Sequence, residues 1–226
     1  VPNARKISIL QILSHRGGIP NVRRDQATWK PGAPVTRDEM LALIVKGTPE
    51  FEPDTKSSYS NSGYFLLALI LEKLTGKSYD QALEQRINSR IGLKDTYLAT
   101  GRIDVNKGEA LTYANNGGDW EQWKQGFETD PSIGFQLVST PGDMPKFIQS
   151  LFDLKLISQD SLNQMKTIRD DEGLGLVTFT FAGRTFYGNT GGGDNYGSWL
   201  MYQPEEKLAV AYATNAKVHP VKDIIS

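Results

Sequence analysis

Residues 57–76 read SSYSNSGYFLLALILEKLTG, and this stretch is the centre of the predicted fold. Apolar residues recur at helical spacing from Phe65 to Leu74, which predicts a helix over 63–75 that ends at Gly76. Tyr59-Ser60-Asn61 stands at the mouth of this helix, so a phenol and a carboxamide lie side by side there. A phenol can relay a proton and an amide can hold a substrate carbonyl. Serine acyl-transfer enzymes that lack a catalytic histidine need such a pair.

Outward from this helix, capping signals predict further helices in the first two thirds of the chain, and alternating polarity predicts strands in the last third. The predicted helices cover 9–14, 37–46, 79–90 and 143–154, with a last one after Ser158, and the predicted strands cover 174–181, 184–188, 198–202 and 207–214. This order indicates one α+β domain over 1–226, with a helical lobe over about 9–168 beside antiparallel strands over about 174–214.

One long segment, residues 98–131, shows no period and is predicted to be irregular. Long irregular segments in compact proteins are more often functional than not. Trp120 and Trp123 in this segment either line a cleft or pack the loop. The acidic pair Asp170-Asp171 is expected in a solvated turn.

The composition excludes several function classes. The 226 residues are 38% hydrophobic and carry a net charge of -1, so no basic excess points to nucleic acid. Cysteine is absent, and the histidines are only two, His15 and His219, so neither a zinc site nor another metal or cofactor site is expected. No apolar run approaches a membrane span. His15, at a predicted helix end, is expected to be structural.

Five segments, taken in order, resemble the serine β-lactamase-like family, which includes class C β-lactamases, DD-peptidases and penicillin-binding proteins. They are LSHRGGIP (13–20), YSNSGY with the helix after it (59–64), GFQLVSTPGD (134–143), YGNTGG (187–192) and PEEKLAVAYATN (204–215). The resemblance covers nearly the whole chain. It implies the β-lactamase/transpeptidase-like fold and serine hydrolysis of an amide, ester or β-lactam through an acyl-enzyme.

The resemblance also implies roles for particular residues. Tyr59 would be catalytic, as the proton relay, and the Gly192 N–H would belong to the oxyanion hole. The implied substrate-binding residues are Asn61, Asn189, Thr190 and Gly191. The substrate would be a small molecule, a peptide or an ester, and the protein would be periplasmic or secreted.

Two departures from the family pattern stand out. No serine in the chain is followed by lysine three residues later, so the Ser-x-x-Lys nucleophile motif is expected upstream of Val1. The third motif begins with Asn189 where the family has lysine or histidine, and an asparagine brings no charge to a substrate carboxylate.

The missing motif leaves three functions open. The chain is most of a serine hydrolase, or a non-catalytic binding protein for peptidoglycan-like peptides or another partner, or a structural or regulatory pseudoenzyme. Residues 222–225 are at best the start of a closing helix. We therefore expect an incomplete sheet with an edge that the upstream segment or another chain covers.

Overall fold

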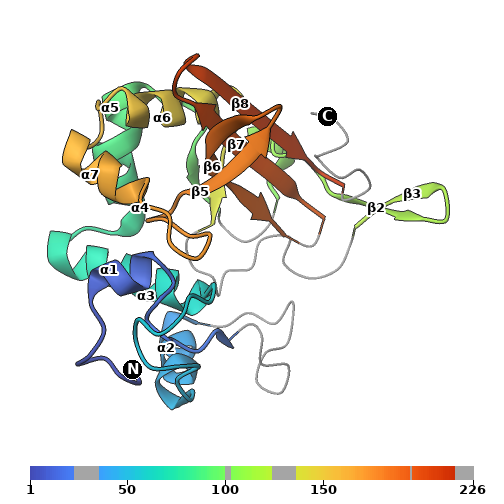
Figure 1. Cartoon of the computed structure of the whole chain (residues 1–226). Coiled ribbons are helices and arrows are strands. Elements are labelled where there is room, and N and C mark those ends of the chain that lie inside the picture. Colours follow the sequence, from blue (N-terminus) through green and yellow to red (C-terminus); the bar gives the residue numbers. More distant parts are fainter. Residues whose placement is uncertain (23–35, 100–102, 124–135, 194, 217–226) are drawn as a thin grey trace.

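The computed structural model describes residues 1–22, 36–99, 103–123, 136–193 and 195–216. Helices form one lobe, and a four-stranded antiparallel sheet lies beside it, as the sequence predicted (Figure 1). The predicted helix at 222–225, His219, residues 134–135 and part of 98–131 lie outside the described residues. Within the described chain, no helix is both long and apolar enough to cross a bilayer.

The helices begin at the capping residues that the sequence indicated. Ser8, Thr36 and Ser78 each form a full capping box, before α1 (Ile9–Leu13), α2 (Arg37–Lys46) and α4 (Tyr79–Leu83). The remaining helices are α3 (Asn61–Thr75), α5 (Ser89–Ile91), α6 (Asp143–Phe152) and α7 (Gln159–Met165). A π-helical turn, Glu84–Asn88, interrupts the predicted helix over 79–90.

The main sheet has the order β5-β6-β7-β8, with every neighbouring pair antiparallel. Its strands are β5 (Val177–Phe181), β6 (Arg184–Gly192), β7 (Gly197–Gln203) and β8 (Leu208–Thr214). Ala182 and Gly183 have φ of 48° and 72°, the left-handed pair that a tight two-residue hairpin needs. β5 begins three residues later than predicted, after Gly175 with φ 76°, and β6 extends four residues beyond its predicted end.

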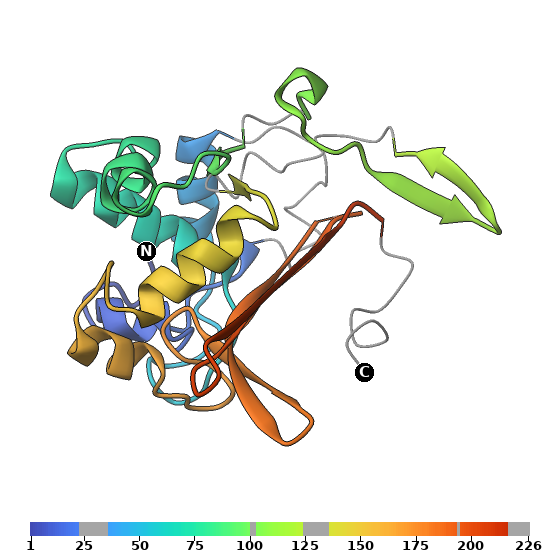
Figure 2. The ribbon, with the colours of Figure 1, turned by 90° about the horizontal axis from the view of Figure 1, so that it is seen from above.

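The prediction of an irregular segment over 98–131 was wrong for its centre. β2 (Tyr113–Asn116) and β3 (Asp119–Gln122) form a hairpin that projects from the body of the protein (Figures 1 and 2). Gly117 and Gly118 have positive φ, and an Asn-Gly step between two short runs is a hairpin signal that the sequence analysis passed over. Trp120 is half exposed on β3, so it neither packs the loop nor lines a buried cleft.

A second small ribbon lies within the helical lobe, where no strands were predicted. β1 (Tyr97–Leu98) pairs with β4 (Leu137–Val138). Each strand has only two residues, which is too short for a period of two to register in the sequence.

Helices cover one face of the main sheet, and Figure 2 shows them all on the same side of it. α6 packs against β7 and β8, where the Phe152 ring lies 4.5 Å from Tyr202 and 6.0 Å from Tyr187. The opposite face carries a second aromatic cluster, in which Phe179 and Trp199 lie 5.1 Å apart. The helical lobe has its own core around Ile44 and Phe65.

Candidate active site

Tyr59 and Asn61 lie side by side at the start of α3. Ser60 is the N-cap of this helix, and its hydroxyl accepts a hydrogen bond from the Gly63 N–H at 3.1 Å. This cap places Tyr59 outside the helix and makes Asn61 its first residue. The Tyr59 hydroxyl donates to Asn61 Oδ1 at 3.3 Å, and Tyr59 is 52% exposed. The predicted pairing of a phenol with a carboxamide is therefore present, and it faces solvent.

His15 lies on the buried side of the Tyr59–Asn61 pair. It is buried, and its ring lies 4.6 Å from the Tyr59 ring and 4.9 Å from the Tyr64 ring. Its Nδ1 accepts a hydrogen bond from the buried Ser60 N–H at 3.1 Å, and its carbonyl oxygen accepts one from the Ser58 N–H at 3.0 Å. His15 thus fixes the backbone on both sides of Tyr59. The sequence predicted a structural histidine, but not its position under the site.

Tyr64 is the second tyrosine that contacts His15, and its environment differs from that of Tyr59. The Tyr64 hydroxyl donates to the Leu13 carbonyl oxygen at 2.9 Å. Burial, then the charge of Glu172, raises the pKa of Tyr64 to about 12. Tyr64 therefore keeps its proton near neutral pH, and of the two phenols at His15 only Tyr59 is exposed to a substrate.

The second part of the candidate site is the end of β6. β5 begins opposite Gly188, so residues 189–192 extend beyond it and leave one edge of β6 unpaired by that strand. Asn189 takes the place of the absent partner, because its Nδ2 donates to the Gly175 carbonyl oxygen at 3.1 Å and its Oδ1 accepts from the Thr190 N–H at 2.8 Å. Backbone groups alternate along a strand, so the Gly192 N–H is expected to point to the same edge.

A continuous set of contacts joins this edge to the Tyr59 pair. A Cβ on Gly175, which holds the Asn189 amide, would lie only 3.6 Å from Tyr64 Oη. Tyr64 in turn stacks against His15, which stacks against Tyr59. These distances place Gly175 beside Tyr64, and a shared site of Asn189 with Tyr59 and Asn61 stays a prediction. That Thr190, Gly191 and Gly192 face Tyr59 stays a prediction.

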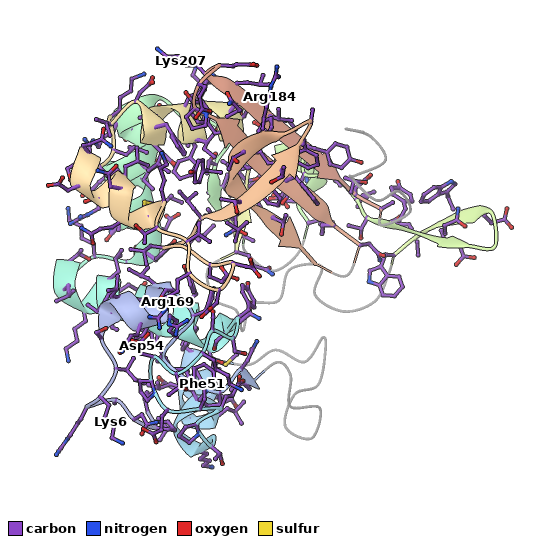
Figure 3. The ribbon with its side chains drawn as sticks, viewed as in Figure 1. Lys6, Phe51, Asp54, Arg169, Arg184 and Lys207 are labelled. Carbon is purple, nitrogen blue, oxygen red and sulfur yellow. The ribbon has the colours of Figure 1, made fainter. Side chains whose placement is uncertain are left out.

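An ion-pair network that the sequence did not predict forms around the buried side chain of Arg16, next to His15 in the chain. The Arg16 guanidinium is 4% exposed and binds Asp54 through Nε at 2.7 Å, and it also binds Asp170. Arg169 binds the same oxygen of Asp54 at 2.8 Å, and Figure 3 shows these two side chains close together. Three loops far apart in sequence meet here, so no local pattern could reveal the network. Asp170 is half exposed in a turn, as predicted, but it also bonds with Arg16.

Arg16 lowers the pKa of Asp54, as expected for a carboxylate beside a cation. The hydrogen bond from Arg16 is the main cause that holds the pKa of Asp54 below its ordinary value, with Arg169 adding to the effect.

Within the described residues, no group of three histidine, aspartate or glutamate side chains is arranged to hold a metal ion.

Comparisons with known proteins identify the family of the chain. A family model described as Beta-lactamase matches residues 1–224. The N-acetylmuramyl-L-alanine amidase of Bacillus subtilis (strain 168) is 26% identical over 258 residues, which cover 96% of this chain and 58% of that protein. The β-lactamase of Providencia stuartii is 23% identical over 251 residues, covering 92% of this chain and 62% of that protein. The chain thus spans about three fifths of the length of these curated relatives.

Solved structures show the same fold. The D-amino acid amidase from Ochrobactrum anthropi SV3, in complex with L-phenylalanine, superposes with a TM-score of 0.82 at 25% identity, over 97% of this chain and 67% of that chain. A D-stereospecific amidohydrolase from Streptomyces sp. gives 0.81 at 24% identity, over 94% and 68%. On the family match over nearly its whole length, the chain belongs to the Beta-lactamase family, and the relatives named here are hydrolases.

Proposed function

We propose that this chain is most of a serine hydrolase that cleaves an amide, ester or β-lactam through an acyl-enzyme. The nucleophilic serine and its lysine would be supplied by residues that precede Val1 in the whole protein. One observation carries the proposal: the exposed Tyr59 hydroxyl lies 3.3 Å from Asn61 Oδ1, and the Tyr59 ring is held against the buried His15.

Each residue would do a separate part of the reaction. Tyr59 would take the proton of the attacking serine and later return it to the leaving group, as a positioned acid and base. The Asn61 amide would hold the acyl-side carbonyl of the substrate. The Gly192 N–H would stabilise the oxyanion, and Thr190 and Gly191 would bind the substrate along the free edge of β6.

An apolar groove supports the placement of a further segment. The groove has a volume of about 340 Å³, and its lining includes Ile7, Ile12, Leu66 and Ile70. Ile12 is shared with the small pocket that His15 and Ser60 line. Apolar surface of this kind favours burial against protein. We propose that residues preceding Val1 fill this groove and carry the nucleophile to the exposed hydroxyl of Tyr59.

Two proteins test the proposal: the 226-residue chain, and the same chain preceded by its upstream residues. With a chromogenic acyl ester, the longer protein should give a burst equal to its concentration and a mass increase of one acyl group. The shorter chain should give neither. An alanine in place of the upstream serine is the control. A covalent adduct on any serine of the shorter chain would refute an upstream nucleophile.

The alternative function is that of a non-catalytic protein that holds peptidoglycan-like peptides in the same cleft. It rests on the absence of Ser-x-x-Lys from the 226 residues. Binding of an acyl peptide without turnover, by a whole protein whose upstream sequence also lacks the motif, would establish it. A periplasmic or secreted location is proposed for either function, and fractionation of the cells that make the protein would test it.

A further inference from the structure

Three segments that are far apart in the sequence meet at the side chain of Arg16. Its side chain is 4% exposed, and its guanidinium binds Asp54 through Nε at 2.7 Å and Asp170 through Nη1. Nη2 donates to the Asp54 carbonyl oxygen at 2.8 Å. All three nitrogens of the buried guanidinium are therefore used, two of them on Asp54 and one on Asp170. A rigid, planar set of donors fixes the position of its partners more closely than a single ion pair does.

The first of the two loops that Arg16 binds leads into Tyr59. The Asp54 N–H donates to the Arg16 carbonyl oxygen at 2.8 Å, so these two residues are bonded through their main chains as well as their side chains. Four residues later, the Ser58 N–H donates to the His15 carbonyl oxygen at 3.0 Å, and Tyr59 follows Ser58. A displacement of Asp54 would therefore pull on a short stretch of backbone that ends at Tyr59.

The second loop leads from Asp170 to Gly175, and from there to β6. Arg169 and Glu172 close this loop through reciprocal backbone hydrogen bonds at 3.0 and 3.3 Å. At its end, the Gly175 carbonyl oxygen accepts a hydrogen bond from the Asn189 amide at 3.1 Å. This loop therefore reaches the part of β6 that the proposed site would use.

The backbone where these segments meet is left-handed at several positions. Four residues here have φ between 53° and 68°, namely His15, Asp54, Asp170 and Asp171. They are half of the eight non-glycine residues with positive φ in the described chain. Aspartate and histidine tolerate this conformation better than most residues do, but it persists only where surrounding bonds hold it. Arg16 supplies such bonds to Asp54 and Asp170.

The charges also make Arg16 the stronger of two links between the loops. Asp54 and Asp170 are both carboxylates, so they repel each other unless a cation lies between them. Arg16 supplies that cation from a buried position, where salt screens it less. Arg169 also links its loop to Asp54, at 2.8 Å, but its side chain is 57% exposed, and exposed pairs contribute little (Figure 3).

We propose that Arg16 is a positioning residue, which holds the loop before Tyr59 against the loop before Gly175 and so fixes Tyr59 for proton transfer. The inference rests on the proposed hydrolase function and names a residue on which the geometry of that site depends. Because its side chain is buried, Arg16 acts through Asp54 and Asp170 and not through contact with substrate. A misplacement of about 1 Å can cost about 10²-fold in rate, so the effect should appear in kcat.

The test uses the whole protein, with the residues that precede Val1, and a chromogenic acyl ester. Arg16→Met keeps much of the apolar part of the side chain and removes the donors. It should lower kcat by about tenfold or more and change KM by less than about threefold. The matched control is Arg37→Met, which removes another arginine ion pair, at 2.9 Å to Glu72, and should leave both constants unchanged.

A double variant separates positioning from a general effect on stability. In Tyr59→Phe no proton relay is left to misplace, so the addition of Arg16→Met should lower kcat by less than about twofold. A residue that only stabilises the fold would lower kcat by the same factor in both backgrounds. The kinetics are measured at a temperature at which thermal unfolding shows every variant to be folded.

Asp170→Asn tests the same link if Arg16→Met does not fold. Asparagine tolerates the left-handed backbone of this half-exposed residue and removes the charge that Arg16 binds. It should lower kcat by about threefold or more in the otherwise wild-type protein, and by less than about twofold in Tyr59→Phe.

The possible failures are distinguishable. Smaller losses than these, or equal losses in both backgrounds, would refute the positioning role of Arg16 and leave the hydrolase proposal standing. Turnover of no acyl ester by the whole wild-type protein would refute the hydrolase proposal, and this inference with it.

Discussion

Replacement of His15 should show how the position of Tyr59 is maintained. His15→Leu removes the acceptor of the buried Ser60 N–H, and an unsatisfied buried donor costs about 1–3 kcal/mol. It also removes ring contacts with two tyrosines, each worth about 0.5–1.5 kcal/mol. We expect a total loss of stability of about 2–6 kcal/mol.

His15→Asn is the matched variant, because asparagine has nearly the shape of leucine and places an oxygen where Nδ1 was. Asparagine also tolerates the left-handed backbone of this residue, where φ is 54°. It should keep the hydrogen bond and lose only the ring contacts. The leucine variant should therefore be less stable than the asparagine variant by about 2 kcal/mol, which for a chain of this size lowers the melting temperature by about 4–8 °C.

The two variants are compared by thermal unfolding and, in the whole protein, by steady-state kinetics. The asparagine variant should retain kcat within about threefold, whereas the leucine variant should lose about tenfold or more in kcat, because small displacements of a catalytic group are costly. Equal melting temperatures for the two variants would refute the role of the Nδ1 hydrogen bond. Equal kcat values would show that His15 does not position Tyr59.

Four other variants test separate parts of the structure. In the whole protein, Tyr59→Phe should lower kcat by about 10²–10⁴-fold with little change in substrate affinity, and turnover like that of the wild type would remove Tyr59 from the mechanism. Thr190→Val should weaken binding and turnover together, so kinetics with normal KM would exclude its hydroxyl from the site. Burial alone would raise the pKa of Asp143, but hydrogen bonds from two backbone N–H groups and a hydroxyl outweigh it and hold the pKa below its ordinary value. The resulting stability is complete above about pH 4 and is lost as pH falls further; urea titrations at several pH values should show a shallower acid limb for Asp143→Asn, and an unchanged limb would contradict this. Gly188→Ala would drive its Cβ into the Leu200 carbonyl oxygen of β7 and should cost more stability than Gly142→Ala, whose Cβ would meet only the Thr140 hydroxyl at an ordinary 3.6 Å; the reverse order in melting temperature would show that β6 can shift there.

Much of the fold follows from patterns that extend over a few neighbouring residues. The capping boxes at Ser8, Thr36 and Ser78 placed helix starts correctly, because each is a local hydrogen-bond arrangement encoded within four residues. The pairing of Tyr59 with Asn61 was also local, since the two residues flank the Ser60 cap at the start of the same helix. The hairpin at Gly117 could have been predicted from the same kind of signal.

Boundaries and breaks were less predictable. The π-helical turn over 84–88 and the late start of β5 depend on the tertiary packing around those segments. The local sequence carries no signal of that packing. The sequence also identified Asn189 as a departure from the family pattern, but it could not say what an asparagine does there. One of its two hydrogen bonds requires Gly175, fourteen residues away, to lie beside the strand.

The sequence by itself determined the α+β class, the family, the Tyr59–Asn61 pair and the absence of a nucleophile motif from these 226 residues. The tertiary structure decided that His15 lies under Tyr59, that Arg16 is buried against two carboxylates, and that the Asn189 amide is bound within the protein. The physical reason is the range of the interactions. Caps, turns and periodicity act between residues a few positions apart, whereas burial, stacking and charge pairing act between segments that only folding brings together.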